Sequence, residues 1–294
     1  MKVAIYSKTP LAAAPFELWK ALRKYTTIDA RLINERNGYP DGRSFPFDII
    51  AAGSGREQVA RILEEADVLH VHNYWPISLR MLNGIHPIMA QFHSLPRLGN
   101  WRELWEKARD GDRYTIRQPL QELEYNLPAL PNLIDPDEYR PAARGPKVRI
   151  AFAPSSRAAT GLPCAKGYAE VRAALDSIAG KRDIEIAWIE GQPYTRNLEL
   201  KRSAHILIDD VVTGNFHRTS LEGACFACAV INKSSRIPWV RADAATLERV
   251  LLELIDNPGH LAIAQEMARA WILAEWHPIE GVKEYEAAYR KASR

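Results

Sequence analysis

Short runs of apolar residues alternate with segments of helical periodicity along most of the chain, and this alternation starts twice. Residues 3–6 form a first apolar run, and residues 148–153 repeat that opening in the second half. Strands that alternate with helices are typical of βαβ units around parallel sheets, because each crossover needs a helix to return the chain. The pattern therefore predicts an α/β protein with two similar halves.

A proline-rich segment separates the two halves. Residues 127–136 contain three prolines, and residues 141–146 begin and end with proline. No helix crosses such a segment, because proline lacks the backbone N–H and restricts the residue before it. A chain of 294 residues is also long enough for two domains with separate cores. We therefore predict a first domain at residues 1–140 and a second at residues 141–276.

Further elements are expected within each half. Strands are predicted at residues 28–33, 68–71, 88–92, 113–117, 184–189, 206–208 and 229–232. Helices are predicted at residues 56–65, 167–178, 219–227, 244–256, 260–275 and 279–291.

The composition excludes several classes of protein. A net charge of +3 is too small for a protein that coats nucleic acid, although it leaves a polyanionic acceptor open. No apolar run reaches the roughly 18 residues of a membrane span, and the first residues lack the apolar core of a signal peptide. The three cysteines cannot all pair, which fits a reducing compartment. We expect a cytoplasmic protein.

Five motifs follow one another in an order that resembles a known family. They are Ala-Asp-Val-Leu-His-Val-His-Asn at residues 66–73, Gln-Phe-His at 91–93, Leu-Pro-Asn-Leu-Ile-Asp at 130–135, Leu-Glu-Gly-Ala-Cys-Phe-Ala-Cys-Ala-Val-Ile at 221–231, and a final helix after Trp276 with Tyr285 and Tyr289. This order is similar to that of the large retaining family of GT-B glycosyltransferases. The resemblance implies two Rossmann-like domains that face each other across a cleft, with residues 277–294 returning to the first domain.

The resemblance also implies a donor site in the second domain. Arg157 and Lys166 resemble the family's two cations for the donor diphosphate, and Glu222 resembles the glutamate that binds the ribose hydroxyls. A leaving diphosphate gains charge during the reaction, so cations and backbone N–H groups at a helix start suit it. The element from residue 213 to 220 offers such N–H groups, with Thr219 or Ser220 as the cap of the next helix. The predicted donor-binding residues are Arg157, Lys166, Gly191, Gly214, Asn215, Phe216, His217, Thr219, Ser220 and Glu222.

The sequence departs from the family pattern at three positions. The family carries a second glutamate eight residues before the ribose-binding one, where this chain has Gly214. The glycine and proline that follow the family's next helix are replaced by Ala227 and Ala229. We expect His217, or the backbone amides of residues 214–216, to contact the donor sugar in place of the missing carboxylate.

His93 is the predicted catalytic residue of the first domain. It follows a strand of the expected parallel sheet, at the edge where such sheets place their ligands. The resemblance implies contact with the donor sugar rather than a role as a base. His70 and His72 alternate with apolar residues on the preceding strand, so both point to one face, and we interpret them as structural.

Two further features have a structural and a functional interpretation. Cys225 and Cys228 form a C-x-x-C pattern, but zinc needs two more ligands, so we interpret both as buried small apolar residues. Residues 97–117 mix charges with aromatic side chains. We favour a helix that packs Trp101 and Trp105 inward; the alternative is that Arg97, Trp101 and Trp105 line an acceptor site.

Together these features predict a glycosyltransferase that moves a sugar from a nucleoside-diphosphate sugar to an acceptor hydroxyl. The resemblance implies a retaining reaction without a metal or other cofactor, with a UDP- or GDP-sugar as the donor. A glycan, a lipid-linked sugar and modified-base DNA remain open as acceptors. Two alternatives also remain: a nucleotide-sugar epimerase or hydrolase of the same fold, and a non-catalytic protein that binds nucleotide sugars or glycans.

Overall fold

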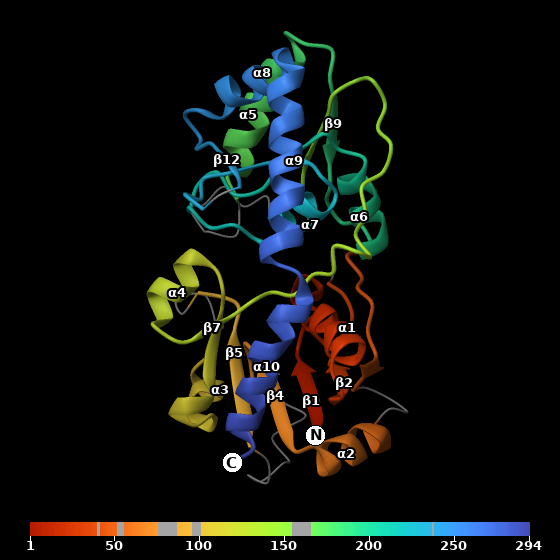
Figure 1. Cartoon of the computed structure of the whole chain (residues 1–294), viewed down its shortest axis with the longest axis vertical. Coiled ribbons are helices and arrows are strands. Elements are labelled where there is room, and N and C mark those ends of the chain that lie inside the picture. Colours follow the sequence, from red (N-terminus) through yellow and green to blue (C-terminus); the bar gives the residue numbers. More distant parts are fainter. Residues whose placement is uncertain (40–41, 52–55, 76–86, 96–100, 155–165, 237) are drawn as a thin grey trace. The chain divides into compact units, whose positions relative to one another are not determined.

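The computed structural model describes residues 1–294 except 40–41, 52–55, 76–86, 96–100, 155–165 and 237. The chain forms two compact units (Figure 1). The first unit comprises Met1–Ile134 and His277–Arg294, and the second comprises Asp135–Trp276. No helix within the described ranges is long and apolar enough to cross a membrane.

The first unit contains a seven-stranded parallel sheet of order β3-β2-β1-β4-β5-β6-β7. Its strands are β1 (Lys2–Ser7), β2 (Asp29–Asn34), β3 (Ile49–Ile50), β4 (Val68–His72), β5 (Ile88–Phe92), β6 (Arg113–Ile116) and β7 (Ala129–Leu130). Its helices are α1 (Ala14–Tyr25), α2 (Arg56–Glu65), α3 (Arg102–Lys107), α4 (Pro119–Tyr125) and α10 (Pro278–Ala292).

Helices cover both faces of this sheet. Val3 and Ile5 of β1 pack with α1 and α10 on one face, whereas Ala4 and Tyr6 pack with α2, α3 and α4 on the other. The alternation follows from the period of two residues in a strand. The C-terminal helix α10 contributes Tyr289 and its neighbours to the first core, so the predicted return of the chain to the first unit is confirmed.

The second unit contains a five-stranded parallel sheet of order β12-β11-β10-β8-β9. Its strands are β8 (Arg149–Phe152), β9 (Glu185–Trp188), β10 (Ile206–Ile208), β11 (Ala229–Asn232) and β12 (Val240–Arg241). Its helices are α5 (Tyr168–Ala179), α6 (Tyr194–Arg202), α7 (Arg218–Cys225), α8 (Leu247–Asp256) and α9 (Pro258–Glu275). The predicted α/β class with two parallel sheets is thus confirmed.

The structure contains elements that the sequence pattern did not predict. The proline-rich segment supplies β7, a two-residue strand between Pro128 and Pro131 at the edge of the first sheet, where a missing N–H is tolerated. Helix α6 is mostly polar and buries only Tyr194 and Lys201, so it lacks the apolar stripe that identifies a helix.

Helix α7 ends in a Schellman motif with alanine at the left-handed position. The amide of Cys228 donates to the carbonyl of Gly223 at 2.8 Å, and the amide of Ala227 donates to Ala224 at 3.0 Å. Ala227 has φ 53°, a conformation that favours glycine. Cys225 and Cys228 are buried and free, as predicted; Cys225 is the last residue of α7, and Cys228 lies in this turn.

We predict that Ala227→Gly raises the free energy of unfolding by about 1 kcal/mol. A left-handed alanine costs about 1–2 kcal/mol, and the greater freedom of glycine in the unfolded chain offsets part of the gain. Urea unfolding of the purified protein measures the change. Ala229→Gly in the buried strand β11 is the control and is expected to destabilise. Destabilisation by both substitutions would contradict the prediction.

Candidate functional site

The strand order of the second unit reverses between β8 and β10. The chain passes from β8 to β9 on one side, and then returns to place β10 on the other side of β8. Open α/β sheets bind their ligands outside the carboxyl ends of the strands at such a reversal. Asp209 and Asp210 follow β10 at this point, and Lys166 lies just before α5. The fold therefore gathers charged side chains where a ligand site is expected.

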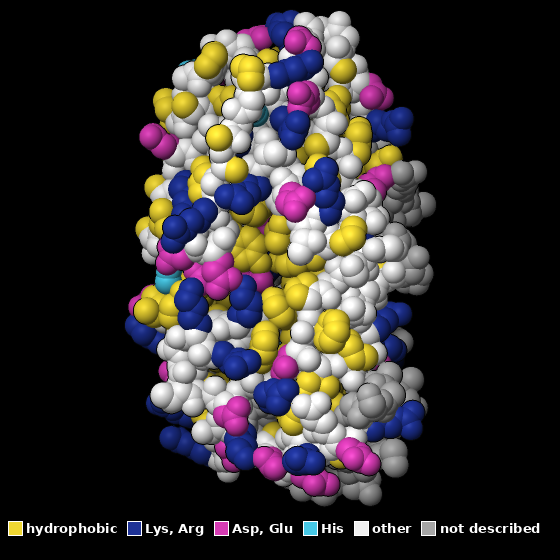
Figure 2. Space-filling model, turned by 90° about the vertical axis from the view of Figure 1, so that its right-hand side faces the viewer, with side chains coloured by type: hydrophobic (Ala, Val, Ile, Leu, Met, Phe, Trp, Pro, Cys, Tyr) yellow, Lys and Arg dark blue, Asp and Glu magenta, His cyan; other side chains and the backbone are white. Residues whose placement is uncertain are grey.

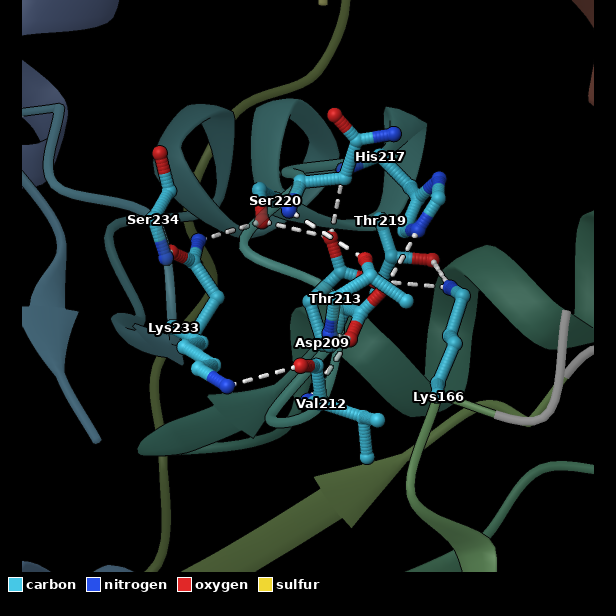
Figure 3. Close-up of polar contacts among 12 residues, drawn as sticks. Lys166, Asp209, Val212, Thr213, His217, Thr219, Ser220, Lys233 and Ser234 are labelled. Carbon is cyan, nitrogen blue, oxygen red and sulfur yellow. Dashed lines mark hydrogen bonds and ion pairs between the residues drawn. The ribbon is translucent and has the colours of Figure 1, made fainter. Parts of the chain in front are cut away.

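Lys166 forms a buried ion pair with Asp209 (Figure 3). Its Nζ atom lies 2.7 Å from Asp209 Oδ1 and donates to the hydroxyl of Thr219 at 3.0 Å. Burial by itself would raise the pKa of Asp209, but the charges of Lys166 and His217 outweigh burial and hold that pKa below its usual value. The Asp209 carboxylate is therefore charged, and it neutralises Lys166.

The backbone before α5 is set up by two left-handed residues. Lys166 has φ 53° and Gly167 has φ 80°. A β-carbon at position 167 would lie 2.6 Å from a methyl group of Val211, so the turn has room only for glycine. A left-handed lysine costs about 1–2 kcal/mol, and such strain is typical of functional sites. The turn places Lys166 beside Asp209 as α5 begins.

Asp209 also contacts the start of helix α7. Its Oδ2 atom accepts hydrogen bonds from the backbone N–H of His217 at 2.6 Å and from the hydroxyl of Ser220 at 2.7 Å. The predicted caps, Thr219 and Ser220, are wrong because the helix begins at Arg218 and contains both residues. The positive end of the α7 dipole thus already faces a carboxylate.

Asp210 orders the loop after β10 and holds His217. It accepts the backbone N–H groups of Val212 and Thr213, both at 2.8 Å, and lies 3.0 Å from His217 Nε2. Burial would raise the pKa of Asp210, but hydrogen bonds from His217 and Thr213 outweigh it and lower the pKa. In the described part of the chain, the other ring nitrogen of His217, Nδ1, has no hydrogen-bond partner.

Glu222 lies between two buried cations. Lys201 Nζ of α6 is 2.5 Å from its Oε2 atom, and Arg218 Nε is 3.2 Å from Oε1. Glu222 lies beyond the first turn of α7, because the helix begins at Arg218 and has no acidic residue in that turn. The charge of Glu222 is therefore stabilised by ion pairs rather than by the helix dipole. Each carboxylate oxygen still has a second lone pair for a ligand.

The other predicted donor residues line the same loop or lie near it. Gly214 has φ 86° and open space where a β-carbon would stand, so only its backbone conformation disfavours a side chain there. The Asn215 amide donates to the Thr213 hydroxyl, and the Phe216 side chain is buried in the core. Gly191 is exposed between β9 and α6, with φ 60°. Within the loop of residues 213–217, the backbone N–H groups of Thr213, Asn215 and His217 have partners, whereas those of Gly214 and Phe216 have none among the described residues.

In the first unit, His93 is held in place by its neighbours. Asn73 Oδ1 accepts its backbone N–H at 2.6 Å, and Gln121 Nε2 donates to its carbonyl at 3.1 Å. Its Nε2 atom lies 2.8 Å from Nδ1 of His72, so one of the two rings donates to the other. Within the described ranges, His93 Nδ1 has no partner and is the ring atom that remains for a ligand.

His70, His72 and His93 form a row of neighbouring imidazoles. The ring centroids are 4.2 Å apart between His70 and His72, and 5.0 Å apart between His72 and His93. His70 Nδ1 also lies 2.9 Å from the Tyr289 hydroxyl of α10. Burial lowers the pKa of His70 and of His93 to about 3, and burial with the two neighbouring histidines lowers that of His72. The three rings are therefore neutral at pH 7.

The remaining predicted residues are placed differently. Trp101 and Trp105 pack against Phe92 and Tyr125 in the first unit, and this packing explains why the two positions are aromatic. An acceptor-binding role for them stays a prediction. Arg157 and Arg97 lie outside the described residues.

The sequence pattern did not identify four charged residues of the site: Asp209, Asp210, Lys201 and Arg218. The two aspartates directly follow a short buried strand, and that position alone was a usable signal.

Comparisons with known proteins identify the fold. No protein-family model matches the sequence, and no curated protein matches it. Among similar solved structures, an alpha-glucosyltransferase in complex with UDP and a 13-mer DNA containing an HMU base has a TM-score of 0.66 at 10% identity, and each chain is covered to 99%. HepE of Anabaena, in complex with UDP and glucose, has a TM-score of 0.65 at 10% identity, with 99% of this chain and 100% of that chain covered.

A third similar structure is the UDP-GlcNAc 2-epimerase of Neisseria meningitidis bound to UDP-GlcNAc. Its TM-score is 0.51 at 12% identity, with 99% of this chain and 100% of that chain covered. The two α/β units, with the last helix in the first unit, are those of the GT-B fold. Identities this low show the fold alone.

We predict that the stability of the first unit falls as the pH falls from about 6.5 toward 3. His70 and His93 have pKa values of about 3 in the folded chain, below the value of about 6.5 in the unfolded chain. Their stabilisation is therefore present above pH 6.5 and is lost as the unfolded state binds protons. Between pH 7 and pH 5, each of these two histidines is expected to lower the free energy of unfolding by on the order of 2 kcal/mol.

Urea unfolding at these two pH values measures the difference. His70→Gln is expected to reduce the pH dependence, whereas His260→Gln, at an exposed position of α9, is expected to leave it unchanged. An equal pH dependence in the wild type and in His70→Gln would contradict the neutral row of histidines.

Proposed function

We propose that this chain is a glycosyltransferase that moves a sugar from a nucleoside-diphosphate sugar to an acceptor hydroxyl. The observation that carries the proposal is the charged cluster around Lys166, Asp209 and Glu222, which lies at the strand-order reversal of the second unit of a GT-B fold. UDP is the favoured nucleotide, because UDP is bound in the similar structures of the alpha-glucosyltransferase and of HepE.

Each residue of the cluster has a role that suits its chemistry. Lys166, before the start of α5, supplies a cation for the diphosphate, and Arg157 is proposed as a second one from the sequence alone. Glu222 accepts hydrogen bonds from the ribose hydroxyls, which suits an acceptor-only group. The amides of Gly214 and Phe216 donate to the donor near its diphosphate or sugar.

His93 of the first unit contacts the sugar through Nδ1. A neutral imidazole there forms a hydrogen bond but carries no charge, which fits a residue that positions the donor. We propose a retaining reaction without a metal, in which the residues of the second unit stabilise the leaving diphosphate. The nucleotide sugar is a co-substrate, and no other cofactor is proposed. We place this reaction in the cytoplasm.

The acceptor is proposed only by its chemistry, as a molecule that offers a hydroxyl group. Glycans, lipid-linked sugars and modified-base DNA all offer a hydroxyl, and DNA is bound in the similar alpha-glucosyltransferase structure. On the face drawn in Figure 2, basic and acidic side chains are mixed rather than gathered into one basic surface. A DNA acceptor would predict binding to DNA that weakens steeply with salt, which the other two acceptors do not predict.

The similar epimerase structure favours one alternative, a nucleotide-sugar epimerase or hydrolase. A non-catalytic protein that binds nucleotide sugars is the other. Incubation of the chain with UDP-sugars and no acceptor separates the three. Slow hydrolysis supports a transferase and an isomeric sugar supports an epimerase. Binding without any turnover, with or without acceptors, contradicts the proposed enzyme.

We predict that the double variant Lys166→Met/Asp209→Asn folds but loses at least about 100-fold in turnover. Removing Lys166 alone would leave a buried carboxylate without its partner, which costs about 3–5 kcal/mol. The double change removes both charges and keeps side chains of similar size, so it separates the loss of function from unfolding. Turnover and thermal unfolding are measured together. Turnover close to that of the wild type would contradict the role of Lys166.

We predict that wild-type protein binds UDP at least about tenfold more tightly than 2′-deoxy-UDP. The deoxy ligand lacks the 2′-hydroxyl and so loses a hydrogen bond to the charged carboxylate of Glu222. Glu222→Gln is expected to reduce this preference, and calorimetric titration measures it. The control is Glu248→Gln, which removes an exposed carboxylate paired with Lys181 in the same unit. If Glu222→Gln keeps the preference, Glu222 forms only the buried ion pairs and does not bind the ribose.

A further inference from the structure

Two neighbouring histidines at the carboxyl edge of the first sheet share one hydrogen bond. His72 is the last residue of β4, and His93 directly follows β5, which pairs with β4 in the sheet (Figure 1). His72 Nδ1 lies 2.8 Å from His93 Nε2. Burial lowers the pKa of both imidazoles, so at pH 7 each ring is neutral and carries a single N–H. The pair therefore has two possible arrangements of its two protons.

The other two ring nitrogens have different surroundings. His72 Nε2 is buried and has no hydrogen-bond partner among the described residues. His93 is partly exposed, and within the described ranges its Nδ1 atom is the ring nitrogen without a partner. A proton on His93 Nδ1 can therefore meet solvent or a ligand, whereas a proton on His72 Nε2 meets no acceptor.

This difference separates the two arrangements. If His93 donates from Nε2, then His72 must carry its own proton on Nε2, as a buried N–H without an acceptor. If His72 donates from Nδ1, then His93 carries its proton on Nδ1, and His72 Nε2 is an unpaired acceptor. Buried N–H groups without an acceptor are rarer in proteins than under-satisfied acceptors. The contacts therefore favour the arrangement in which His72 is the donor.

We propose that His72 holds His93 in the Nδ1–H tautomer, and that His93 donates this N–H to an oxygen of the donor sugar. This deepens the proposed function and rests on it. His72 is a positioning residue, because it acts through His93 and not on the substrate. His93 then has no free lone pair, since Nε2 accepts from His72 and Nδ1 carries a proton. It therefore cannot remove a proton from an acceptor hydroxyl, which excludes it as a general base.

The tautomers are directly measurable in the full chain without any ligand. Long-range proton–nitrogen correlation spectra of isotope-labelled histidine at pH 7 distinguish protonated from bare ring nitrogens. We expect a protonated Nδ1 and a bare Nε2 for both His72 and His93. The loss of signals in His72→Asn and in His93→Gln assigns the two rings. A His93 ring that is protonated at Nε2 overturns the proposal.

Two substitutions at position 72 test whether His72 sets this tautomer. In His72→Leu no N–H faces His93 Nε2, so we expect both tautomers of His93. The side-chain amide of His72→Asn can place an N–H where histidine has Nδ1, and we expect it to retain the Nδ1–H form of His93. Tyr289→Phe is the control, because it removes the hydroxyl beside His70 and leaves the contact between His72 and His93 in place. Thermal unfolding shows whether each variant is folded.

Calorimetric titration measures the contact with the sugar. The ligands are UDP and the tighter-binding of UDP-glucose and UDP-GlcNAc. UDP lacks the sugar, so its affinity is expected to be the same in the wild type and in all three variants. We expect His72→Leu to reduce the preference for the UDP-sugar over UDP by about five- to tenfold, which corresponds to the loss of one hydrogen bond. His72→Asn and Tyr289→Phe are expected to keep the preference.

The outcomes separate this inference from the proposed function. An unchanged His93 tautomer in His72→Leu overturns the role of His72. Mixed tautomers with an unchanged sugar preference overturn the contact between His93 Nδ1–H and the sugar. If the wild type binds neither UDP nor a UDP-sugar, the proposed function and the sugar contact are both overturned, whereas the tautomers of the two rings are still tested by the spectra alone.

Discussion

The buried ion pair between Lys166 and Asp209 is the interaction on which the second unit depends. A lysine and an aspartate of such low exposure are stable only together, because each alone would carry an uncompensated charge in the protein interior. Asp209 connects this pair to the start of α7, and Asp210 continues the network to the loop after β10. The charge network thereby joins the turn before α5, the end of the central strand and the start of α7.

This arrangement changes how a cation serves in the site. A free surface lysine would bind an anion directly, but Lys166 already has a carboxylate beside it. A diphosphate must therefore share Lys166 with Asp209, and the groups with spare hydrogen-bonding capacity become important. In the described loop that follows β10, these are the Gly214 and Phe216 amides and Nδ1 of His217. A network that is rigid and already satisfied also avoids reorganisation when charge develops on a leaving group.

Much of the fold was predictable from the sequence, because it depends on patterns of a few residues. The strands at residues 88–92, 206–208 and 229–232 have the predicted bounds, since each is a short and mostly apolar segment of the kind that forms a buried strand. Helix α6 was not predictable, because its contribution is a buried ion pair rather than an apolar stripe. The ion-pair partners of Lys166 and Glu222 could also not be predicted from the sequence. Asp209 and Lys201 are distant in the chain, and only the strand order brings them to the same edge.

The central claim is that the carboxyl edge of β8 and β10 binds the donor nucleotide. A crystal structure of the chain soaked with UDP tests this claim most directly. We predict that the diphosphate lies beside Lys166 and the start of α5, with the ribose hydroxyls within hydrogen-bonding distance of Glu222. UDP bound elsewhere on the second unit, with the Lys166–Asp209 and Lys201–Glu222 pairs untouched by the ligand, would contradict the account.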